Sequence, residues 1–225
     1  RHVLQASLLH KLDPTDIVLS TRHETHGLAK ELASTIKTNL AAVVTPRPHF
    51  RVRHKLERWK LHGTPRAIAD RFLDRLPILR RLVPPRVIAA VFSTAWNRWC
   101  TARRFQNRAQ PCNNCRLGCA GGAEDSIEHY SRCKTVREFH STCLNLHCDW
   151  LLPLWLGVHS SQGQDEALLT CGAIGVYSVY SVTNNARHAG TMSPSEAKAA
   201  LLQAAKEAVM GHPRATSILR SRWWR

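Results

Sequence analysis

Five side chains that commonly bind zinc lie within 22 residues, and this cluster constrains the fold more than any other feature of the sequence. They are Cys112, Cys115, Cys119, His129 and Cys133. Zinc takes four thiolate or imidazole ligands in a tetrahedron, so a chain that gathers them around one ion closes the loop between them. The sequence shows no secretory signal, which disfavours disulfides here. We therefore predict a zinc-binding element, with thiols packed as small apolar side chains as the alternative.

The cluster offers one ligand too many, so the sequence leaves two assignments open. The first is Cys115 and Cys119 with His129 and Cys133, and the second replaces Cys119 by Cys112. His129 and Cys133 are four positions apart, a spacing that places both on one face of a single helical turn. We expect the zinc to be structural, because a catalytic zinc keeps one position open for water.

The remaining cysteines are weaker candidates. Cys143, His147 and Cys148 could form a second zinc group, whereas Cys100 and Cys171 fall on apolar helical faces and are expected in the core. A zinc deaminase requires His-x-Glu followed by Pro-Cys-x-x-Cys. In this chain the Pro-Cys-x-x-Cys element precedes the histidine, and His129 is followed by no glutamate at the required position, so that chemistry is not expected.

Positive charge is concentrated in the first half of the chain. The formal net charge is +16, and residues 44–108 alone carry 16 basic and 3 acidic side chains. Arginine outnumbers lysine by 24 to 8, and its planar fork suits phosphate and stacking on bases. A block this basic indicates a polyanionic partner, and nucleic acid is the expected one. A merely solvated basic face is the alternative.

Apolar periodicity and capping signals indicate a mainly α fold. We predict helices over residues 22–44, 64–76, 85–104 and 164–188, and a last one from the Ser193-Pro194-Ser195-Glu196 capping signal to Gly211. The expected regions are a basic helical connector (1–83), a basic helix (84–110), the zinc-binding element (111–148) and a helical C-terminal region (149–225). No apolar run approaches the roughly 20 residues of a membrane-spanning helix.

Arginines and lysines of the basic block and of the zinc element are the candidate contacts to nucleic acid. They are Arg51, Arg53, Lys55, Arg58, Lys60, Arg103, Arg104, Arg108, Arg116 and Arg132. Trp96 and Trp99 have two interpretations, base stacking or core packing, and their helical spacing favours the core. The chain begins at Arg1 without an initiator Met, so we expect it to be part of a longer protein.

Three stretches together resemble a known family. They are Trp96-Asn97-Arg98-Trp99-Cys100-Thr101-Ala102-Arg103-Arg104-Phe105, Cys-Arg-Leu-Gly-Cys at 115–119, and Glu124-Asp125-Ser126-Ile127-Glu128-His129-Tyr130-Ser131-Arg132-Cys133. They look like the zinc-binding tail of non-LTR (LINE-type) retrotransposon reverse transcriptases. The resemblance covers roughly residues 84–190, and residues 115–133 carry its specific part. This chain departs from the family pattern in its extra Cys112 and in the nine-residue gap before His129.

The resemblance implies a noncatalytic module that binds template RNA or target DNA beside an upstream polymerase. Residues 1–80 would then be a thumb-like connector. The polymerase motif Tyr-x-Asp-Asp and the family's endonuclease motif are missing from this sequence, so we do not expect an enzyme. The alternative function is a structural or assembly subunit of a large ribonucleoprotein, derived from such a fragment. RNA is the favoured ligand and DNA the second. The expected location is nuclear or cytoplasmic, without secretion or a membrane partner.

Overall fold

The structure, a computed structural model, describes residues 34–35, 48–105, 114–119, 122–159 and 165–223. The chain divides into two compact units, Arg1–Arg51 and Val52–Arg225. Nearly all described residues belong to the second unit. The helix predicted over residues 22–44 lies outside the described residues except for Ser34 and Thr35, which are helical.

The prediction of a mainly α fold is confirmed, since the described residues contain helices and no strand. The helices are α4 (Pro48–Glu57), α5 (Pro65–Leu82), α6 (Pro85–Ala95), α7 (Ala102–Phe105), α8 (Ile127–Tyr130), α9 (Lys134–Leu144), α10 (Leu152–Trp155), α11 (Glu166–Ala189), α12 (Pro194–Val209) and α13 (Pro213–Trp223). Among them, none combines the length and the apolar character that crossing a bilayer requires.

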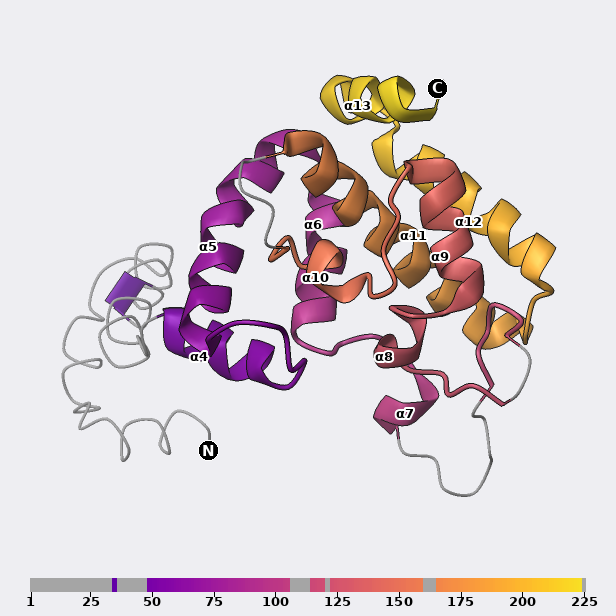
Figure 1. The fold of residues 1–225 in the computed structure, drawn as a ribbon, viewed down its shortest axis with the longest axis horizontal. Helices are drawn as coiled ribbons and strands as arrows, with labels where there is room; N and C mark the ends of the chain where they lie inside the picture. The colour runs from indigo at the N-terminus through magenta and orange to yellow at the C-terminus, as the bar shows by residue number, and fades with distance from the viewer. Residues whose placement is uncertain (1–33, 36–47, 106–113, 120–121, 160–164, 224–225) are drawn as a thin grey trace, which may run out of the picture. The chain divides into compact units, whose positions relative to one another are not determined.

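Helix α11 is the centre of the second unit and contacts α5, α6, α9, α10, α12 and α13 (Figure 1). Its apolar residues are buried around most of its circumference, as expected for a helix enclosed by others. Gly172 permits one close approach, because a Cβ there would lie 2.7 Å from the carbonyl oxygen of Leu154. A side chain at this position would therefore clash with the backbone of α10.

Helix α5 is longer than predicted. Thr64 caps it as expected, its side chain accepting a hydrogen bond from the Ala67 N–H at 3.3 Å. The predicted end at Leu76 is wrong, because the helix continues through Pro77 to Leu82. Burial of Ile78, Leu79 and Leu82 in the core offsets the hydrogen bond that a proline removes.

The single helix predicted over residues 85–104 is wrong, because the chain leaves the helix after Ala95 and forms α7 only at Ala102. Asn97 adopts a left-handed conformation with φ of 52°, which turns the chain. The turn lets Trp99 enter the core, where its Nε1–H donates to Thr94 Oγ1 at 2.9 Å. Burial of a large aromatic side chain outweighs the helical hydrogen bonds lost at the break.

Helix α12 follows its sequence signals closely, whereas α13 is a further helix that the sequence analysis did not predict. Ser193 and Glu196 form the predicted capping box at the start of α12. After Met210, Gly211 adopts a φ of 76° and the chain turns into α13. One hydrophobic core joins these helices to α5, α6 and α9, and it includes Cys115, Leu117 and Cys133. The Cys/His element is thus built into the main core.

Candidate metal centre

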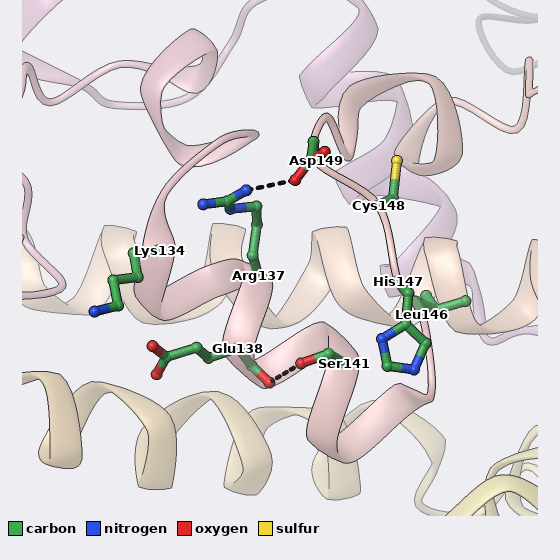
Figure 2. A pocket seen from close by; sticks show the side chains of 8 residues that line it. All are labelled: Lys134, Arg137, Glu138, Ser141, Leu146, His147, Cys148 and Asp149. Atoms are coloured by element: carbon green, nitrogen blue, oxygen red, sulfur yellow. Dashed lines mark hydrogen bonds and ion pairs between the residues drawn. The ribbon is translucent and has the colours of Figure 1, made fainter.

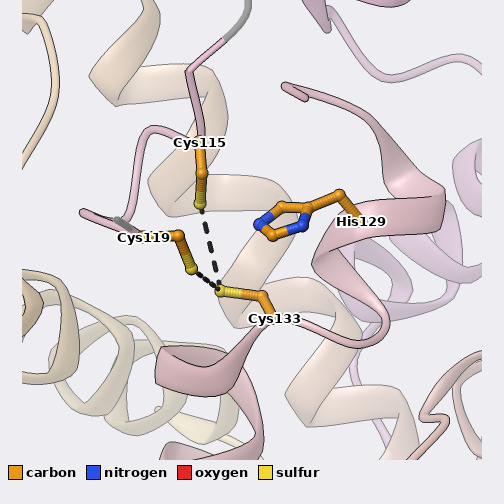
Figure 3. A group of neighbouring side chains, drawn as sticks. All are labelled: Cys115, Cys119, His129 and Cys133. Carbon is orange, nitrogen blue, oxygen red and sulfur yellow. Dashed lines mark hydrogen bonds between the residues drawn. The ribbon is translucent and has the colours of Figure 1, made fainter. Parts of the chain in front are cut away.

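Cys115, Cys119, His129 and Cys133 converge in the structure (Figure 3). One ligand atom from each lies within 4.8 Å of all the others. Cys133 Sγ is 3.9 Å from Cys115 Sγ and 3.1 Å from Cys119 Sγ, and all three thiols are free. Tertiary folding therefore brings together the first of the two ligand sets that the sequence left open.

A tight turn presents the first two cysteines. The Leu117 N–H points at Cys115 Sγ at 3.4 Å, and the Cys115 N–H donates to the carbonyl of Ala123 at 2.7 Å. Gly118 adopts a φ of 75°, and a Cβ at this position would lie 2.5 Å from the carbonyl oxygen of Met192. A glycine is required here both for the left-handed backbone and for the close contact with the segment before α12.

The second pair of candidate ligands, His129 and Cys133, spans a break between two helices. Ser126 caps α8, its side chain accepting from the His129 N–H at 3.1 Å. The predicted single helical turn from His129 to Cys133 is wrong, because α8 ends at Tyr130 and Cys133 is the N-cap residue of α9. The two side chains nevertheless converge, since successive turn hydrogen bonds link Ser131, Arg132 and Cys133 back to α8.

Burial makes it unfavourable for all three neighbouring thiols to ionise when no cation is bound. Hydrogen bonding with the Cys115 sulfur and burial together raise the pKa of Cys133 to about 12. Burial also raises the pKa of Cys119, whereas the hydrogen bond from Cys133 lowers that of Cys115. A bound cation reverses this balance, because a thiol that coordinates a metal loses its proton.

A second observation, separate from the spacing of the four side chains, indicates that they could bind a metal ion. His129 Nε2 is buried and has no hydrogen-bond partner among the described residues. A buried polar atom without a partner costs about 1–3 kcal/mol, so native structures rarely keep one without a reason. The ring lies beside three sulfurs at close spacing, so a bound metal would supply that reason. The four residues can hold one ion.

A buried carboxylate fixes the loop that carries these ligands. Asp125 is 4% exposed, and it accepts from Tyr130 Oη at 2.7 Å and from the Ala102 N–H at 2.9 Å. The Arg116 Nε lies 3.8 Å from the same carboxylate. Burial and the Asp125 charge raise the pKa of Tyr130. Asp125 therefore joins α7, α8 and the cysteine turn.

An aromatic stack connects the segment that carries the four candidate ligands, residues 115–133, to the core. We call this segment the metal element. Trp99 lies with its ring centroid 6.1 Å from that of Tyr130 and 5.9 Å from that of Trp155, at interplanar angles of 30° and 24°. Trp99 is 1% exposed, so its interpretation as a core residue is confirmed. Trp96 is half-buried against Phe92 and Phe72.

The other cysteine predictions have different outcomes. Cys112, the alternative ligand, lies outside the described residues. Cys171 is buried in the core as predicted, but Cys100 is only half-buried and lies in the turn after α6. Cys143 is half-buried and packs against the core.

The second zinc group does not form among the residues that the structure describes. Figure 2 shows Cys148 and His147 projecting in different directions from the chain that follows α9. The Cys148 thiol donates to the carbonyl of Trp150 at 3.1 Å, and His147 hydrogen-bonds to the Asn145 side chain at 3.2 Å. The nearby cavity of about 490 Å³ has paired charges, Arg137 with Asp149 and Glu138 with Lys198.

The predicted nucleic-acid contacts on α4 lie on the surface. Arg51, Arg53 and Lys55 are exposed on this helix, and Arg53 forms an ion pair with Glu57 at 3.3 Å. Arg58 and Lys60 are exposed in the turn that follows. The Arg58 guanidinium lies 4.9 Å from the centroid of the Trp59 ring.

The remaining predicted contacts surround the metal element. Arg103 is exposed and pairs with Glu124 at 3.2 Å and with Glu128 at 3.7 Å. Arg104 is exposed and donates to the Arg98 carbonyl at 2.6 Å. Arg132 is exposed, whereas Arg116 is turned toward Asp125. Arg108 lies outside the described residues. Eight of the ten candidates are thus exposed and could contact a nucleic acid. Arg116 instead contacts Asp125 and is a structural residue of the loop.

Sequence reasoning missed three residues next to these cations. Trp150, His62 and Asn97 lie close to Arg132, Lys60 and Arg58. Trp150 reads in the sequence as the start of an apolar segment, and His62 as part of a turn. Neither carries a spacing signal, because the residues that they meet are distant in the chain.

Comparison of the chain with family models, with curated proteins and with solved structures returns no match.

Proposed function

We propose that Cys115, Cys119, His129 and Cys133 bind one structural zinc ion. The buried, unpartnered Nε2 of His129 beside three thiols carries this proposal. Three thiolates and an imidazole form a closed tetrahedral zinc set, with no position left for a reacting water. Bound zinc would tie the cysteine turn to α8 and α9 and thereby hold α8 in place.

Metal content tests the zinc proposal. The purified chain is expected to contain one zinc per molecule by elemental analysis. Cys115→Ser and Cys133→Ser are each expected to lose most of it, because both side chains are buried at the centre of the cluster. Cys143→Ser is the matched control, since this half-buried thiol lies outside the cluster, and it should keep the metal. A folded wild-type chain without metal would contradict the proposal.

We further propose that the chain is a noncatalytic module that binds nucleic acid, with RNA favoured over DNA. The support is the position of exposed cations beside the metal element. Arg132 lies between the ligands His129 and Cys133, and Arg103 is tied to Glu128, the residue before His129. A loop closed by zinc would fix the direction of these side chains. Their contacts to phosphates would then fix the orientation of the protein on the nucleic acid.

Salt dependence of binding tests this function. We expect the zinc-loaded chain to bind a labelled single-stranded RNA in a fluorescence anisotropy titration. If six phosphates are neutralised, affinity should fall about 300-fold between 50 and 200 mM salt. An affinity independent of salt, or no binding to RNA or DNA at 50 mM salt, would refute the proposal.

The resemblance to non-LTR reverse transcriptase tails suggests a polymerase module as the protein partner of this chain. A polymerase module would supply the catalysis, and this chain would hold template or target. The rival role, an assembly subunit of a ribonucleoprotein, predicts recovery in a fixed multi-subunit particle. Co-purification separates the two roles, since the first predicts a polymerase polypeptide in the recovered material.

A further inference from the structure

A cleft beside the metal element gathers cations from three distant parts of the chain. It contains a cavity of about 440 Å³, within the range of ligand pockets. Arg58, Lys60 and His62 line it from the turn after α4, Arg103 from α7, and Arg132 and Trp150 from the segments that flank α9. An adjoining cavity of about 310 Å³ shares Arg58 and Arg103 and adds Arg104. We refer to the two cavities together as the basic cleft.

Among the described residues, few carboxylates balance the positive charge of the basic cleft. Glu128 is the one carboxylate among the lining residues of the two cavities, and it pairs with Arg103. Arg58, Lys60 and Arg132 have no carboxylate within ion-pair distance in the described part of the chain. Three close cations without counter-charges repel one another, and an anion bound between them removes this repulsion.

Two of these arginines are held in position by aromatic rings and keep N–H donors for a ligand, since Asn97 uses only two of the five N–H groups of Arg58. The Arg132 guanidinium lies 5.3 Å from the centroid of the Trp150 ring, and the Arg58 guanidinium lies over Trp59. Stacking uses the flat face of a guanidinium and leaves its N–H groups at the edge. With the Asn97 amide turned to suit its partners, its oxygen accepts from Arg58 at 2.9 and 3.1 Å, which fixes that side chain further.

The basic cleft also has an aromatic wall. Trp150 and His62 meet edge to face, with ring centroids 6.0 Å apart and an interplanar angle of 86°. Trp150 is half-buried and His62 is exposed, so the wall is in contact with solvent. Trp59, by contrast, is buried and donates its Nε1–H to the Ala95 carbonyl at 3.2 Å, which makes it a structural residue.

We propose that the basic cleft binds a nucleotide of single-stranded nucleic acid, a proposal that rests on the nucleic-acid-binding function above. Arg58, Lys60 and Arg132 would contact the phosphate, and the base would pack against Trp150 and His62. A pocket of this size with an aromatic wall suits an unpaired base, because a base inside a duplex keeps both faces stacked on its neighbours. Duplexes and acidic peptides should therefore compete poorly for it.

Anisotropy titrations of the full, zinc-loaded chain with labelled 12-nucleotide single-stranded RNA and DNA test the cleft. Trp150→Leu should weaken binding about 5- to 150-fold, the effect of losing one stacked base, whereas Trp150→Phe should retain most of the affinity. Lys60→Gln and Arg132→Gln should each reduce the slope of log affinity against log salt by about 0.7. Zinc content and thermal unfolding confirm that each variant is folded.

The control variant is Lys206→Gln on α12, which removes one exposed charge from a helix that lines neither cavity. If the cleft variants bind single strands like Lys206→Gln while the wild type binds tightly, the cleft proposal is overturned and the general function stands. Equal affinity for a duplex of the same length, or equal competition by polyglutamate, also overturns the cleft. If the wild type binds no nucleic acid, the general function fails.

Discussion

Gly175 lies against the side chain of His140, and this contact makes a sharp test of the packing around α11. His140 is fully buried, with Nδ1 2.8 Å from the carbonyl oxygen of Val136 and Nε2 3.0 Å from Trp155 Nε1. A carbonyl can only accept and an indole N–H can only donate, so the proton of the neutral imidazole is on Nδ1. A Cβ at position 175 would lie 2.2 Å from Nε2.

Gly175→Ala should therefore destabilise the protein even though alanine is the better helix former. Displacing the imidazole leaves the buried Trp155 N–H unpaired, which costs about 1–3 kcal/mol. Overpacking costs about 1–3 kcal/mol more, and helix propensity returns about 1 kcal/mol. We expect a net loss of about 1–5 kcal/mol in the free energy of unfolding, measured by urea denaturation with one equivalent of zinc present.

A double-mutant cycle isolates the contact. In a His140→Ala background the clash is gone, so Gly175→Ala should become neutral or stabilising by up to about 1 kcal/mol. An equal loss in both backgrounds would show that the cost has another origin. Wild-type stability of the Gly175→Ala variant would refute the position of His140 described above.

Two further predictions concern buried ionisable groups. Burial lowers the pKa of His140 from 6.5 to about 4, so the unfolded chain binds a proton that the folded chain does not, and stability is lost as pH falls from 6.5 toward 4. The gap of about 2.5 pH units, at 1.36 kcal/mol each, amounts to about 3 kcal/mol. Acid also weakens zinc binding in every variant. In urea denaturation from pH 7 to 4, the wild type and His147→Gln should therefore each lose about 3 kcal/mol more than His140→Gln. Asp125→Ala should cost about 3–5 kcal/mol, because Arg116 and the Tyr130 hydroxyl lose their partner inside the protein. Thermal unfolding measures this loss. Asp125→Asn should be less destabilising because it keeps one acceptor oxygen. A wild-type melting temperature for Asp125→Ala would contradict the role of this carboxylate.

The sequence predicted those features whose determinants lie close together in the chain. Thr64 and Ser193 identify helix starts because a cap requires only residues up to three positions away. The clustering of cysteines with His129 likewise indicated the segment that could hold a metal ion, although it left Cys112 and Cys119 as alternatives. Local signals failed where packing outweighed them, at Pro77 inside α5 and at Trp99, where entry into the core ends a helical pattern.

Tertiary structure alone decided what surrounds the candidate ligands. Nothing near Asp125 in the sequence indicates that it joins Ala102 to Tyr130, and nothing near Lys60 indicates that it lines the same cavity as Trp150. Periodicity and spacing describe the geometry of one segment. The meeting of distant segments, such as those of Arg86 and Glu207, depends instead on how their apolar faces share one core, which is a property of the whole chain.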